Sequence, residues 1–402
     1  MHQIGLIGTG YWGPNIARSF ELTGKATIRW LCDINAAQLA KIASKYPHAK
    51  TTSQVDEVLV DETVNVVAIS TPASTHFEIT RRALGAGKHV LVEKPVTLNS
   101  KEALQLIRLA QKKQKVLMVG HVFEYNFTIR ALKNLIDSGE LGEIYYLNFE
   151  RTNLGPVRTD VNALWDLAAH DVSIMCYLLD SSPVNVTARG QAFLNGGMED
   201  AVFATFTFAN GIIAHVNGSW LNPRKVREII AVGSKKMAIW NDLDLQSPIR
   251  IYDKRIVDPS EIPDTFMAYK TAVVDGGVYI PNIQHNQPLQ AECEHFIECV
   301  EQGGQPLSDG YSGLRVVLAL EAATASIKNH SRITPVKMRD RDARLDDGRQ
   351  QVGMGDKKLL DEFVEEVQEH LSLEYTQWLE SLSKAETAVA KFQKTAKPQR
   401  PA

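Results

Sequence analysis

Hydrophobic and polar residues alternate in two different ways along the chain, and the change falls near residue 120. Before it, short apolar runs rich in β-branched residues alternate with amphipathic stretches. The runs lie at 4–7, 27–31, 64–69, 89–92 and 116–119, and the helix-like stretches at 13–22, 36–45, 76–86 and 100–113. Continuous apolar runs suit strands that are buried on both faces of a parallel sheet. The alternation therefore predicts βαβ units, and a parallel-sheet α/β domain over residues 1–121.

The pattern after residue 120 predicts a second, α+β domain over residues 122–337. Helices are expected at 126–138, 164–179, 289–302 and 311–328, and strands at 143–151, 184–192, 201–208, 211–220, 226–233 and 236–241. Asn210-Gly211 separates two of the strand-like runs, and this dipeptide favours a tight hairpin turn. The sheet is therefore expected to be mainly antiparallel. The segment 253–287 has no clear period, which suggests a surface loop or an arm that contacts another subunit.

The last 65 residues form a third segment, 338–402, with a composition of its own. It holds 11 basic and 13 acidic residues, a larger charged share than the 23% of the whole chain. No Gly or Pro interrupts 356–397, where apolar residues recur every three or four positions from Leu360 to Phe392. This pattern predicts a linker and a long amphipathic helix. The helix would pack on its own body, on another subunit or on a partner; the alternative is a solvated helix.

The charge balance and the cysteines limit the classes of function. The 44 basic residues nearly balance the 47 acidic ones, and the net charge of −3 argues against a nucleic-acid partner. The four cysteines show no CxxC spacing, which indicates a reducing compartment and no metal site. The N-terminus lacks a signal-peptide pattern, and no apolar run reaches about 18 residues. We therefore expect a soluble, cytoplasmic protein with no membrane partner.

A glycine-rich loop follows the first predicted strand and opens the first predicted helix. Its sequence, Gly8-Thr9-Gly10-Tyr11-Trp12-Gly13, has the spacing of a dinucleotide-binding turn. The first glycine would permit the turn, the second would let the backbone approach a pyrophosphate, and the third would allow close packing of helix and strand. The alternative is an ordinary strand–turn–helix.

Asp33 closes the second predicted strand, about 20 residues after the last glycine of this loop. A carboxylate at this place accepts hydrogen bonds from the adenosine ribose. Ile34 and Asn35 follow it, so no arginine is present there to receive a 2′-phosphate. The sequence therefore favours NAD over NADP as the cofactor.

Three more segments carry residues suited to chemistry. Two of them, Ser70-Thr71-Pro72 with His76 and Glu93-Lys94, follow predicted parallel strands at the sheet edge where ligands bind. We expect them to contact the cofactor. The third contains Asp166 and His170, which lie four positions apart on one face of a predicted helix.

A lysine, a histidine and an acid together suit the oxidation of an alcohol. Lys94 could polarise the hydroxyl oxygen, or accept its proton if burial lowers the pKa of the amine. His170 is a natural proton acceptor near neutral pH, and Asp166 could orient it or the substrate. The structural alternatives are a surface Lys-Pro and a capping or surface Asp/His pair.

Taken together, these motifs resemble the Gfo/Idh/MocA-type oxidoreductases. The resemblance rests on the loop at 8–13, Thr71-Pro72 with His76, Glu93-Lys94-Pro95 and the DxxxH of 166–170, and it spans about residues 1–337. It implies a Rossmann domain followed by a large, open-faced and mainly antiparallel sheet, which commonly supports dimers or tetramers. It also implies catalytic roles for Lys94 and His170, with Asp166 lining the site.

Further segments are similar to the nucleotide-sugar branch of this family, which includes UDP-N-acetylglucosamine and UDP-N-acetylglucosaminuronate 3-dehydrogenases. These segments are 120–126, 164–171, 218–225 and 251–254. The resemblance implies oxidation of a sugar C3 hydroxyl to a ketone, with Tyr125, Asn126, Arg158 and Asn162 lining the sugar side of the pocket. It leaves Arg130, Lys225 and Arg227 as candidates for the diphosphate or a uronate carboxylate, or as solvated surface charges.

Two other functions stay open at this point. One is the oxidation of a free polyol, aldose or cyclitol; the other is a non-catalytic NAD-binding sensor built on the same fold. The presence of Lys94, Asp166 and His170 argues against the sensor, because a binding module has no need of that set.

Two aromatic residues in these segments have more than one interpretation. His121 follows the last predicted Rossmann strand, so it could face the cleft. Trp220 is expected to pack in the second sheet, or to form an aromatic platform for a uracil or a sugar.

Overall fold

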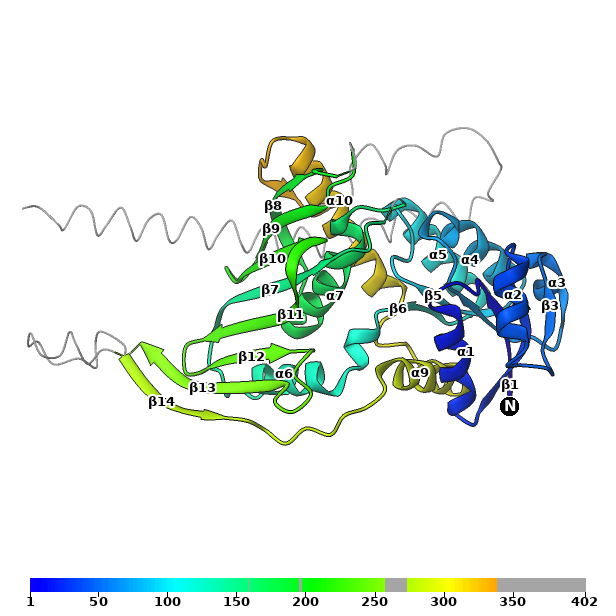
Figure 1. The fold of residues 1–402 in the computed structure, drawn as a ribbon, viewed down its shortest axis with the longest axis horizontal. Helices are drawn as coiled ribbons and strands as arrows, with labels where there is room; N and C mark the ends of the chain where they lie inside the picture. Colours follow the sequence, from blue (N-terminus) through cyan, green and yellow to red (C-terminus); the bar gives the residue numbers. More distant parts are fainter. Residues whose placement is uncertain (159, 195–196, 257–272, 338–402) are drawn as a thin grey trace, which may run out of the picture.

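The first 120 residues build a parallel sheet with the strand order β3-β2-β1-β4-β5-β6 (Figure 1). The computed structural model describes residues 1–158, 160–194, 197–256 and 273–337. The strands of this sheet are β1 (His2–Ile7), β2 (Ala26–Cys32), β3 (Lys50–Thr52), β4 (Val66–Ile69), β5 (His89–Glu93) and β6 (Leu117–Gly120). The helices that connect them are α1 (Gly13–Leu22), α2 (Ala36–Ala43), α3 (Val55–Val60), α4 (His76–Gly85) and α5 (Ser100–Lys113).

This doubly wound sheet confirms the predicted fold class, and local sequence explains its elements. All four residues of the central strand β4 are completely buried, as expected for a strand covered on both faces. Asn35 and Asn99 cap α2 and α5, because their side chains accept hydrogen bonds from the first free backbone N–H groups. The short elements β3 and α3 were not predicted, since three and six residues carry too little periodicity.

The strand order decides where a ligand can bind. The two halves of the sheet diverge between β1 and β4, and ligands of open α/β sheets bind at such a switch point. The carboxyl ends of β1, β4 and β5 lie next to one another there. The loops that begin at Gly8, Ser70 and Lys94 are therefore neighbours in space.

A second sheet has nine strands in the order β14-β13-β12-β11-β7-β10-β9-β8-β15. Every pairing in it is antiparallel except the parallel pair of β7 and β10. Its strands are β7 (Ile144–Leu154), β8 (Pro183–Gln191), β9 (Ala201–Phe208), β10 (Ile213–Ser219), β11 (Leu221–Gly233), β12 (Met237–Asn241), β13 (Ile249–Ile256), β14 (Val273–Tyr279) and β15 (Thr334–Pro335). Gly211 has a φ of +87° in the turn between β9 and β10, which confirms the predicted hairpin.

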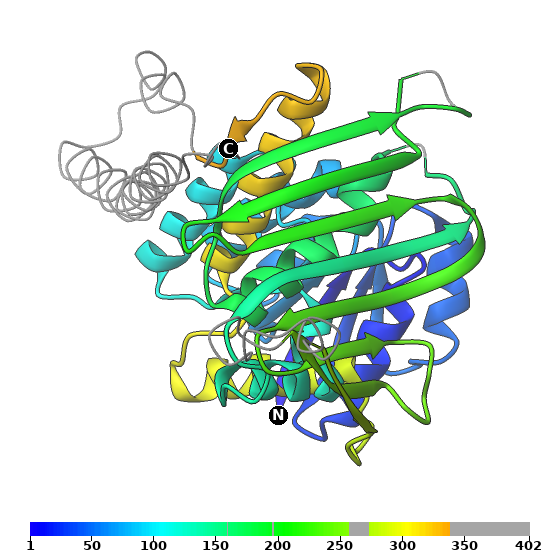
Figure 2. The same ribbon diagram turned by 90° about the vertical axis from the view of Figure 1, so that its left-hand side faces the viewer.

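Helices cover one face of this sheet, and the other face is open (Figure 2). The covering elements are α6 (Phe127–Asp137), α7 (Ala169–Leu179) and α10 (Gly310–Lys328). Large apolar side chains on the open face have much of their surface exposed, such as Tyr146 at 45% and Phe203 at 49%. The open-faced sheet is what the family resemblance implied.

The C-terminal helices return to the first domain. Helix α9 (Pro288–Gln302) packs on α1, where Phe296 and Phe20 form an edge-to-face pair with ring centroids 6.2 Å apart. Helix α10 packs on both α5 and β8, so it joins the two sheets. No helix among the described residues is long and apolar enough to cross a membrane.

Where the structure describes residues 253–287, part of them is strand rather than the surface loop that was one interpretation; the other, an arm that contacts another subunit, stays a prediction. These residues contain the end of β13 and all of β14, which pair and extend beyond the rest of the sheet (Figure 1). Nearly every residue of β14 is exposed, so the strand has no alternation of buried and exposed positions to reveal it. The predicted linker and helix at 338–402 lie outside the described residues.

Candidate active site

The three glycines of the first loop have different surroundings. Gly8 has a φ of +93°, and a Cβ there would lie 2.7 Å from the Ser70 carbonyl. A Cβ on Gly13 would lie 2.4 Å from the Gly8 carbonyl oxygen, so helix and loop meet without room for a side chain. Gly10, by contrast, faces open space: a Cβ there would lie 4.0 Å from the nearest atom, on the Gln38 side chain. A loop that is closely packed at Gly8 and Gly13 but leaves the backbone accessible at Gly10 is suited to binding a pyrophosphate.

Asp33 lies directly beside this loop. One of its carboxylate oxygens accepts hydrogen bonds from the Thr9 backbone N–H at 2.6 Å and from the Thr9 hydroxyl at 2.8 Å. The other accepts from the Asn35 N–H at 2.8 Å. The carboxylate is thus held at the carboxyl end of β2, where it can receive a ribose. The Tyr11 side chain is 86% exposed and the Trp12 side chain 41% exposed, at the entry to α1.

Replacing Asp33 with asparagine is expected to weaken NAD binding about tenfold, because the ribose loses a charged hydrogen-bond acceptor. The amide oxygen can still accept from Thr9, so the loop keeps its shape. Calorimetric titration with NAD measures the affinity, and kcat at saturating NAD serves as the control. An unchanged affinity would refute the ribose role.

Hydrogen bonds connect the loop after β4 to the glycine loop and to the loop after β5. Ser70 donates a hydrogen bond to the Gly8 carbonyl at 2.8 Å. His76 is 1% exposed, and its ring nitrogens lie 2.7 Å from the Pro95 carbonyl and 2.9 Å from the Thr71 carbonyl. The structure therefore places His76 beneath the two loops, where it holds them together, rather than at the surface that a cofactor would touch.

Lys94 and Asp166 come together although 72 residues separate them. The Lys94 ammonium donates to the Asp166 backbone carbonyl at 2.8 Å and lies 3.5 Å from its carboxylate. Burial lowers the pKa of Lys94, while the charges of Asp166 and Glu93 act in the opposite direction. The first domain thus supplies a buried amine, and the second supplies the acid that holds it.

The Asp166 carboxylate has two further partners. Arg158 donates to one oxygen at 3.0 Å, and the Trp220 indole N–H donates to the other at 3.3 Å. Trp220 is 1% exposed, which agrees with the predicted packing in the sheet. Its hydrogen bond to Asp166 was not predicted, since nothing in the sequence near Trp220 points to a residue 54 positions away.

A wide helical turn brings His170 to the same place. Residues Leu164–Ala168 form a π-helix that leads into α7, where the sequence predicted one uninterrupted α-helix. Such single π-turns are frequent at functional sites. Burial lowers the pKa of His170 well below its usual value, with further lowering by the charges of Lys94 and Arg151. Burial therefore favours the neutral form of the imidazole.

His121 also lies near Lys94, directly after β6. Its side chain is 2% exposed, and neither ring nitrogen has a hydrogen-bond partner among the described residues. Burial, and then the charges of Lys94 and Arg315, lower the pKa of His121 to about 3. His121 is thus a second neutral imidazole, near enough to Lys94 for the lysine charge to lower its pKa.

The structure does not bring all predicted substrate residues to this cluster. Tyr125 is completely buried, and its hydroxyl lies 3.0 Å from the Ser308 hydroxyl, so its phenol lies within the core. Asn126 caps α6 through the Thr128 N–H. Asn162 donates to Glu199 at 2.6 Å. Each of these three side chains thus has a structural partner.

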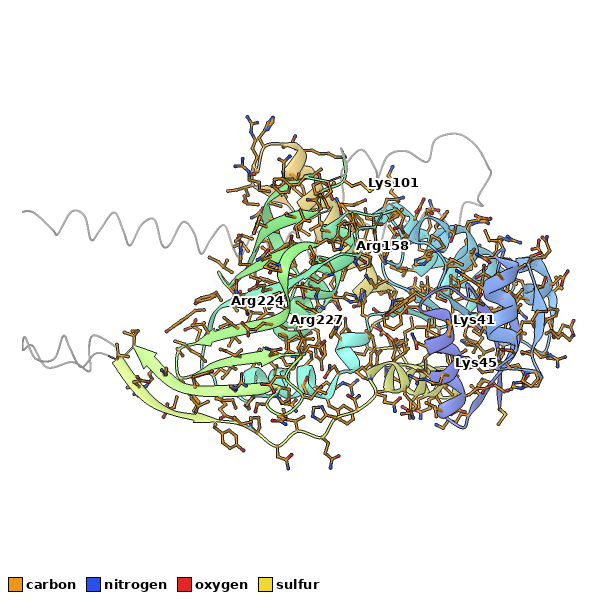
Figure 3. The ribbon with its side chains drawn as sticks, viewed as in Figure 1. Lys41, Lys45, Lys101, Arg158, Arg224 and Arg227 are labelled. Carbon is orange, nitrogen blue, oxygen red and sulfur yellow. The ribbon has the colours of Figure 1, made fainter. Side chains whose placement is uncertain are left out.

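The predicted cationic residues also differ in whether they lie at the Lys94–Asp166 cluster. Arg158 lies at the junction of the two domains, whereas Arg224 and Arg227 lie on β11 (Figure 3). Arg227 is paired with Asp242 at 2.9 Å, and Arg130 donates to the Glu124 carbonyl at 2.9 Å. Lys225 is exposed on β11. Of the predicted cations, Arg158 contacts the Lys94–Asp166 pair directly.

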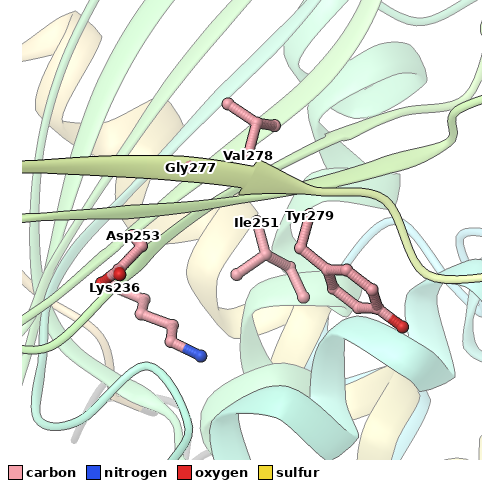
Figure 4. Close-up of a pocket in the computed structure, with 6 residues that line it drawn as sticks. All are labelled: Lys236, Ile251, Asp253, Gly277, Val278 and Tyr279. Atoms are coloured by element: carbon pink, nitrogen blue, oxygen red, sulfur yellow. The ribbon is translucent and has the colours of Figure 1, made fainter.

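A surface hollow of about 270 Å³ lies elsewhere, at the extended end of the second sheet (Figure 4). It is lined by Lys236, Ile251, Asp253, Gly277, Val278 and Tyr279. None of these residues belongs to the cluster around Lys94, so the hollow is separate from the candidate active site.

The parallel sheet, its glycine loop and the buried lysine at the switch point define an NAD-binding oxidoreductase. The chain belongs to the Gfo/Idh/MocA family of oxidoreductases. A family model described as "Oxidoreductase family, NAD-binding Rossmann fold" matches residues 2–121, and one described as "GFO/IDH/MocA C-terminal domain" matches residues 129–239. The resemblance and the NAD cofactor predicted from the sequence are thereby confirmed.

Similar proteins are named for different alcohols. The UDP-N-acetylglucosamine 3-dehydrogenase of Acidithiobacillus ferrooxidans is 30% identical over 324 residues, which cover 79% of this chain and 94% of that protein. A solved structure of that enzyme matches with a TM-score of 0.69 and 26% identity, over 83% of this chain and all of the other. The inositol 2-dehydrogenase of Rhizobium meliloti is 23% identical over 342 residues, or 83% of this chain and 98% of that protein.

Proposed function

We propose that this protein oxidises the C3 hydroxyl of a nucleotide-linked sugar, UDP-N-acetylglucosamine or its uronate, to a ketone with NAD. The observation that carries the proposal is the buried Lys94 ammonium, held by Asp166 beside the neutral imidazole of His170. The likeness to UDP-N-acetylglucosamine 3-dehydrogenase over most of both chains supports this substrate class.

The glycine loop and Asp33 would hold the dinucleotide, as the open side of Gly10 allows. When bound, NAD supplies the hydride acceptor. Lys94 then either donates a hydrogen bond to the substrate oxygen or takes its proton as an amine. Neutral His170 is the other possible acceptor. Asp166 orients the Lys94 side chain, and its contacts with Arg158 and Trp220 keep the carboxylate in place.

On the substrate side, the proposal assigns the anionic part of the nucleotide sugar to the cations nearest this cluster. Arg158 is 39% exposed, and its guanidinium donates to Asp166 at 3.0 Å and to Asp160 at 2.9 Å and 2.6 Å, so an anionic ligand would take the place of Asp160 on it. Lys225 is exposed on β11, the strand that also carries Arg227. Charge-assisted contacts to diphosphate or carboxylate oxygens suit these side chains.

The proposal includes a homo-dimer or homo-tetramer formed through the open face of the second sheet. The exposed Tyr146 and Phe203 side chains on that face support it. Apolar side chains of this size on an uncovered sheet are typical of interaction surfaces.

A panel of alcohols tests the substrate class. The purified protein is incubated with NAD and UDP-N-acetylglucosamine, its uronate, a dTDP-sugar or myo-inositol, and the absorbance at 340 nm is followed. We expect a kcat/KM for a UDP-sugar at least about 10²-fold above that for myo-inositol. An assay of the keto product, coupled to an aminotransferase, detects turnover if tightly bound NAD is recycled.

The inositol 2-dehydrogenases among the relatives favour a second candidate, a free cyclitol. Oxidation of myo-inositol without oxidation of any UDP-sugar would establish that candidate and contradict the proposal. The His170→Ala variant, measured with the same panel, shows whether any observed turnover belongs to this site.

A further inference from the structure

His170 has an unusual environment for a proton acceptor. A catalytic histidine is commonly oriented by a hydrogen bond from one ring nitrogen to a carboxylate or carbonyl. No side-chain hydrogen bond of His170 is present among the described residues. Another contact must therefore hold the imidazole ring at its place on α7.

That contact is an aromatic one. The ring of Phe123, in the short 3-10 helix Val122–Tyr125 after β6, lies 5.1 Å from the His170 ring, centroid to centroid. The two planes meet at 74°, which is the edge-to-face arrangement that aromatic pairs prefer. Such a contact fixes the plane of the imidazole and leaves its nitrogens to other groups.

A buried guanidinium supports Phe123 in turn. The central carbon of the Arg151 guanidinium lies 4.6 Å from the centre of the Phe123 ring, within the range of a cation–π contact. Arg151 lies on β7, which follows the 3-10 helix and α6 in the sequence. Because a guanidinium is planar, it can stack on an aromatic ring.

Asp171 prevents Arg151 from moving. The Arg151 Nε and Nη2 lie 2.9 Å and 2.8 Å from the same Asp171 carboxylate oxygen, and the two residues are 4% and 2% exposed. Separating a pair this deeply buried would leave an uncompensated charge, which is strongly unfavourable. Asp171 directly follows His170 in α7. The contacts from Asp171 to Arg151, from Arg151 to Phe123 and from Phe123 to His170 therefore return to the helix on which they start.

We propose that Phe123 and Arg151 are positioning residues for His170. The stack of Arg151 on Phe123, anchored by Asp171, sets the orientation in which the imidazole meets the substrate hydroxyl. This inference rests on the proposed catalytic role of His170. It assigns a kinetic function to a buried ion pair that would otherwise serve only to join β7 and α7.

Two variants test the proposal. Phe123→Leu removes the ring but keeps an apolar side chain, and Arg151→Lys keeps the charge beside Asp171 but removes the planar group. Each is expected to lower kcat about tenfold or more while KM stays within about twofold, because a misplaced acid–base group slows the reaction without weakening binding. The matched control is Phe296→Leu, which breaks the edge-to-face pair with Phe20 away from the site.

Combination with His170→Ala separates positioning from general damage. If Phe123 acts through His170, Phe123→Leu will cause no further loss in the His170→Ala background. A chemical readout needs no substrate: diethyl pyrocarbonate should modify His170 several-fold faster in Phe123→Leu than in the wild type, followed by peptide mass spectrometry. The Phe296→Leu control should change neither measurement.

The possible results have distinct meanings. Normal kcat and normal His170 modification in both variants would overturn the positioning role and leave the proposed function intact. An equal loss in the presence and absence of His170 would also overturn it. Full activity of His170→Ala would remove the catalytic role itself, and the positioning role with it.

Discussion

Replacing Lys94 with methionine is expected to lower kcat about 10²-fold or more, the usual scale for the loss of an acid–base group. Methionine has a similar length and no charge, so it removes the amine that faces the substrate oxygen in the proposed mechanism. The variant should fold, because Asp166 keeps its hydrogen bonds from Arg158 and Trp220. It should also bind NAD with nearly normal affinity, as measured by calorimetry.

Lys88→Met is the matched control for this variant. Lys88 is also a buried lysine, 6% exposed, and its ammonium donates to the Asp61 and Val64 carbonyls at 2.9 Å and 2.7 Å. Its loss should reduce stability without selective loss of kcat. Lys94→Met activity within a few-fold of the wild type would contradict the proposed mechanism.

The pH dependence of kcat/KM follows from the same residue. Burial lowers the pKa of Lys94 below 10.5, and a protonated amine cannot take the substrate proton. If Lys94 is the acceptor, oxidation falls as the pH falls through this lowered pKa, and the acid limb disappears in Lys94→Met. His170 contributes no such limb above pH 6.5, because its pKa lies well below that value. A limb that persists in Lys94→Met would point to another group, such as Glu93, whose pKa burial raises to about 7.

The second large effect is expected in the glycine loop, where two similar substitutions should act differently. Gly13→Ala places a methyl group 2.4 Å from the Gly8 carbonyl oxygen, so α1 must move. We expect a loss of about 1–3 kcal/mol in the free energy of unfolding, as for an overpacked site, together with weaker NAD binding. Denaturant unfolding and calorimetric titration measure the two quantities.

Gly10→Ala is the counterpart. Its Cβ would meet open space in the protein alone, so the stability should stay near that of the wild type. NAD affinity should still fall about tenfold or more, since the methyl group occupies the side from which a pyrophosphate approaches the backbone. Normal NAD binding in this variant would mean that the dinucleotide does not approach at Gly10.

Much of the site was visible in the sequence where its parts are local. The spacing from Gly8 to Gly13 and the position of Asp33 depend on one strand–turn–helix unit, and short-range sterics govern such units. The Asp166–His170 spacing was also local, although the π-turn between them was not predicted. A single extra residue in a helical turn changes no hydrophobic period that a sequence pattern could reveal.

Other roles depended on neighbours far along the chain. The sequence predicts that His76, which follows Thr71-Pro72, contacts the cofactor, yet the structure buries it as a link between the Thr71 and Pro95 carbonyls. The family resemblance implies that Tyr125 lines the substrate pocket, yet its hydroxyl is hydrogen-bonded to the Ser308 hydroxyl in the core. In both cases, burial by distant segments decides whether a polar side chain meets a ligand or another part of the protein.

The amino-acid sequence by itself determined the fold class and the glycine loop and predicted which side chains are candidates for the chemistry, because hydrophobic period, turn chemistry and residue type are properties of short segments. Only the tertiary structure decided which of these side chains meet. The strand order places the ends of β1, β4 and β5 together, and packing of the second domain then brings Asp166 to Lys94. The stack of Arg151 on Phe123 behind His170 likewise exists only because β7, α7 and the turn after β6 pack together. Contacts of this kind arise from burial and close packing between remote segments, which no local pattern encodes.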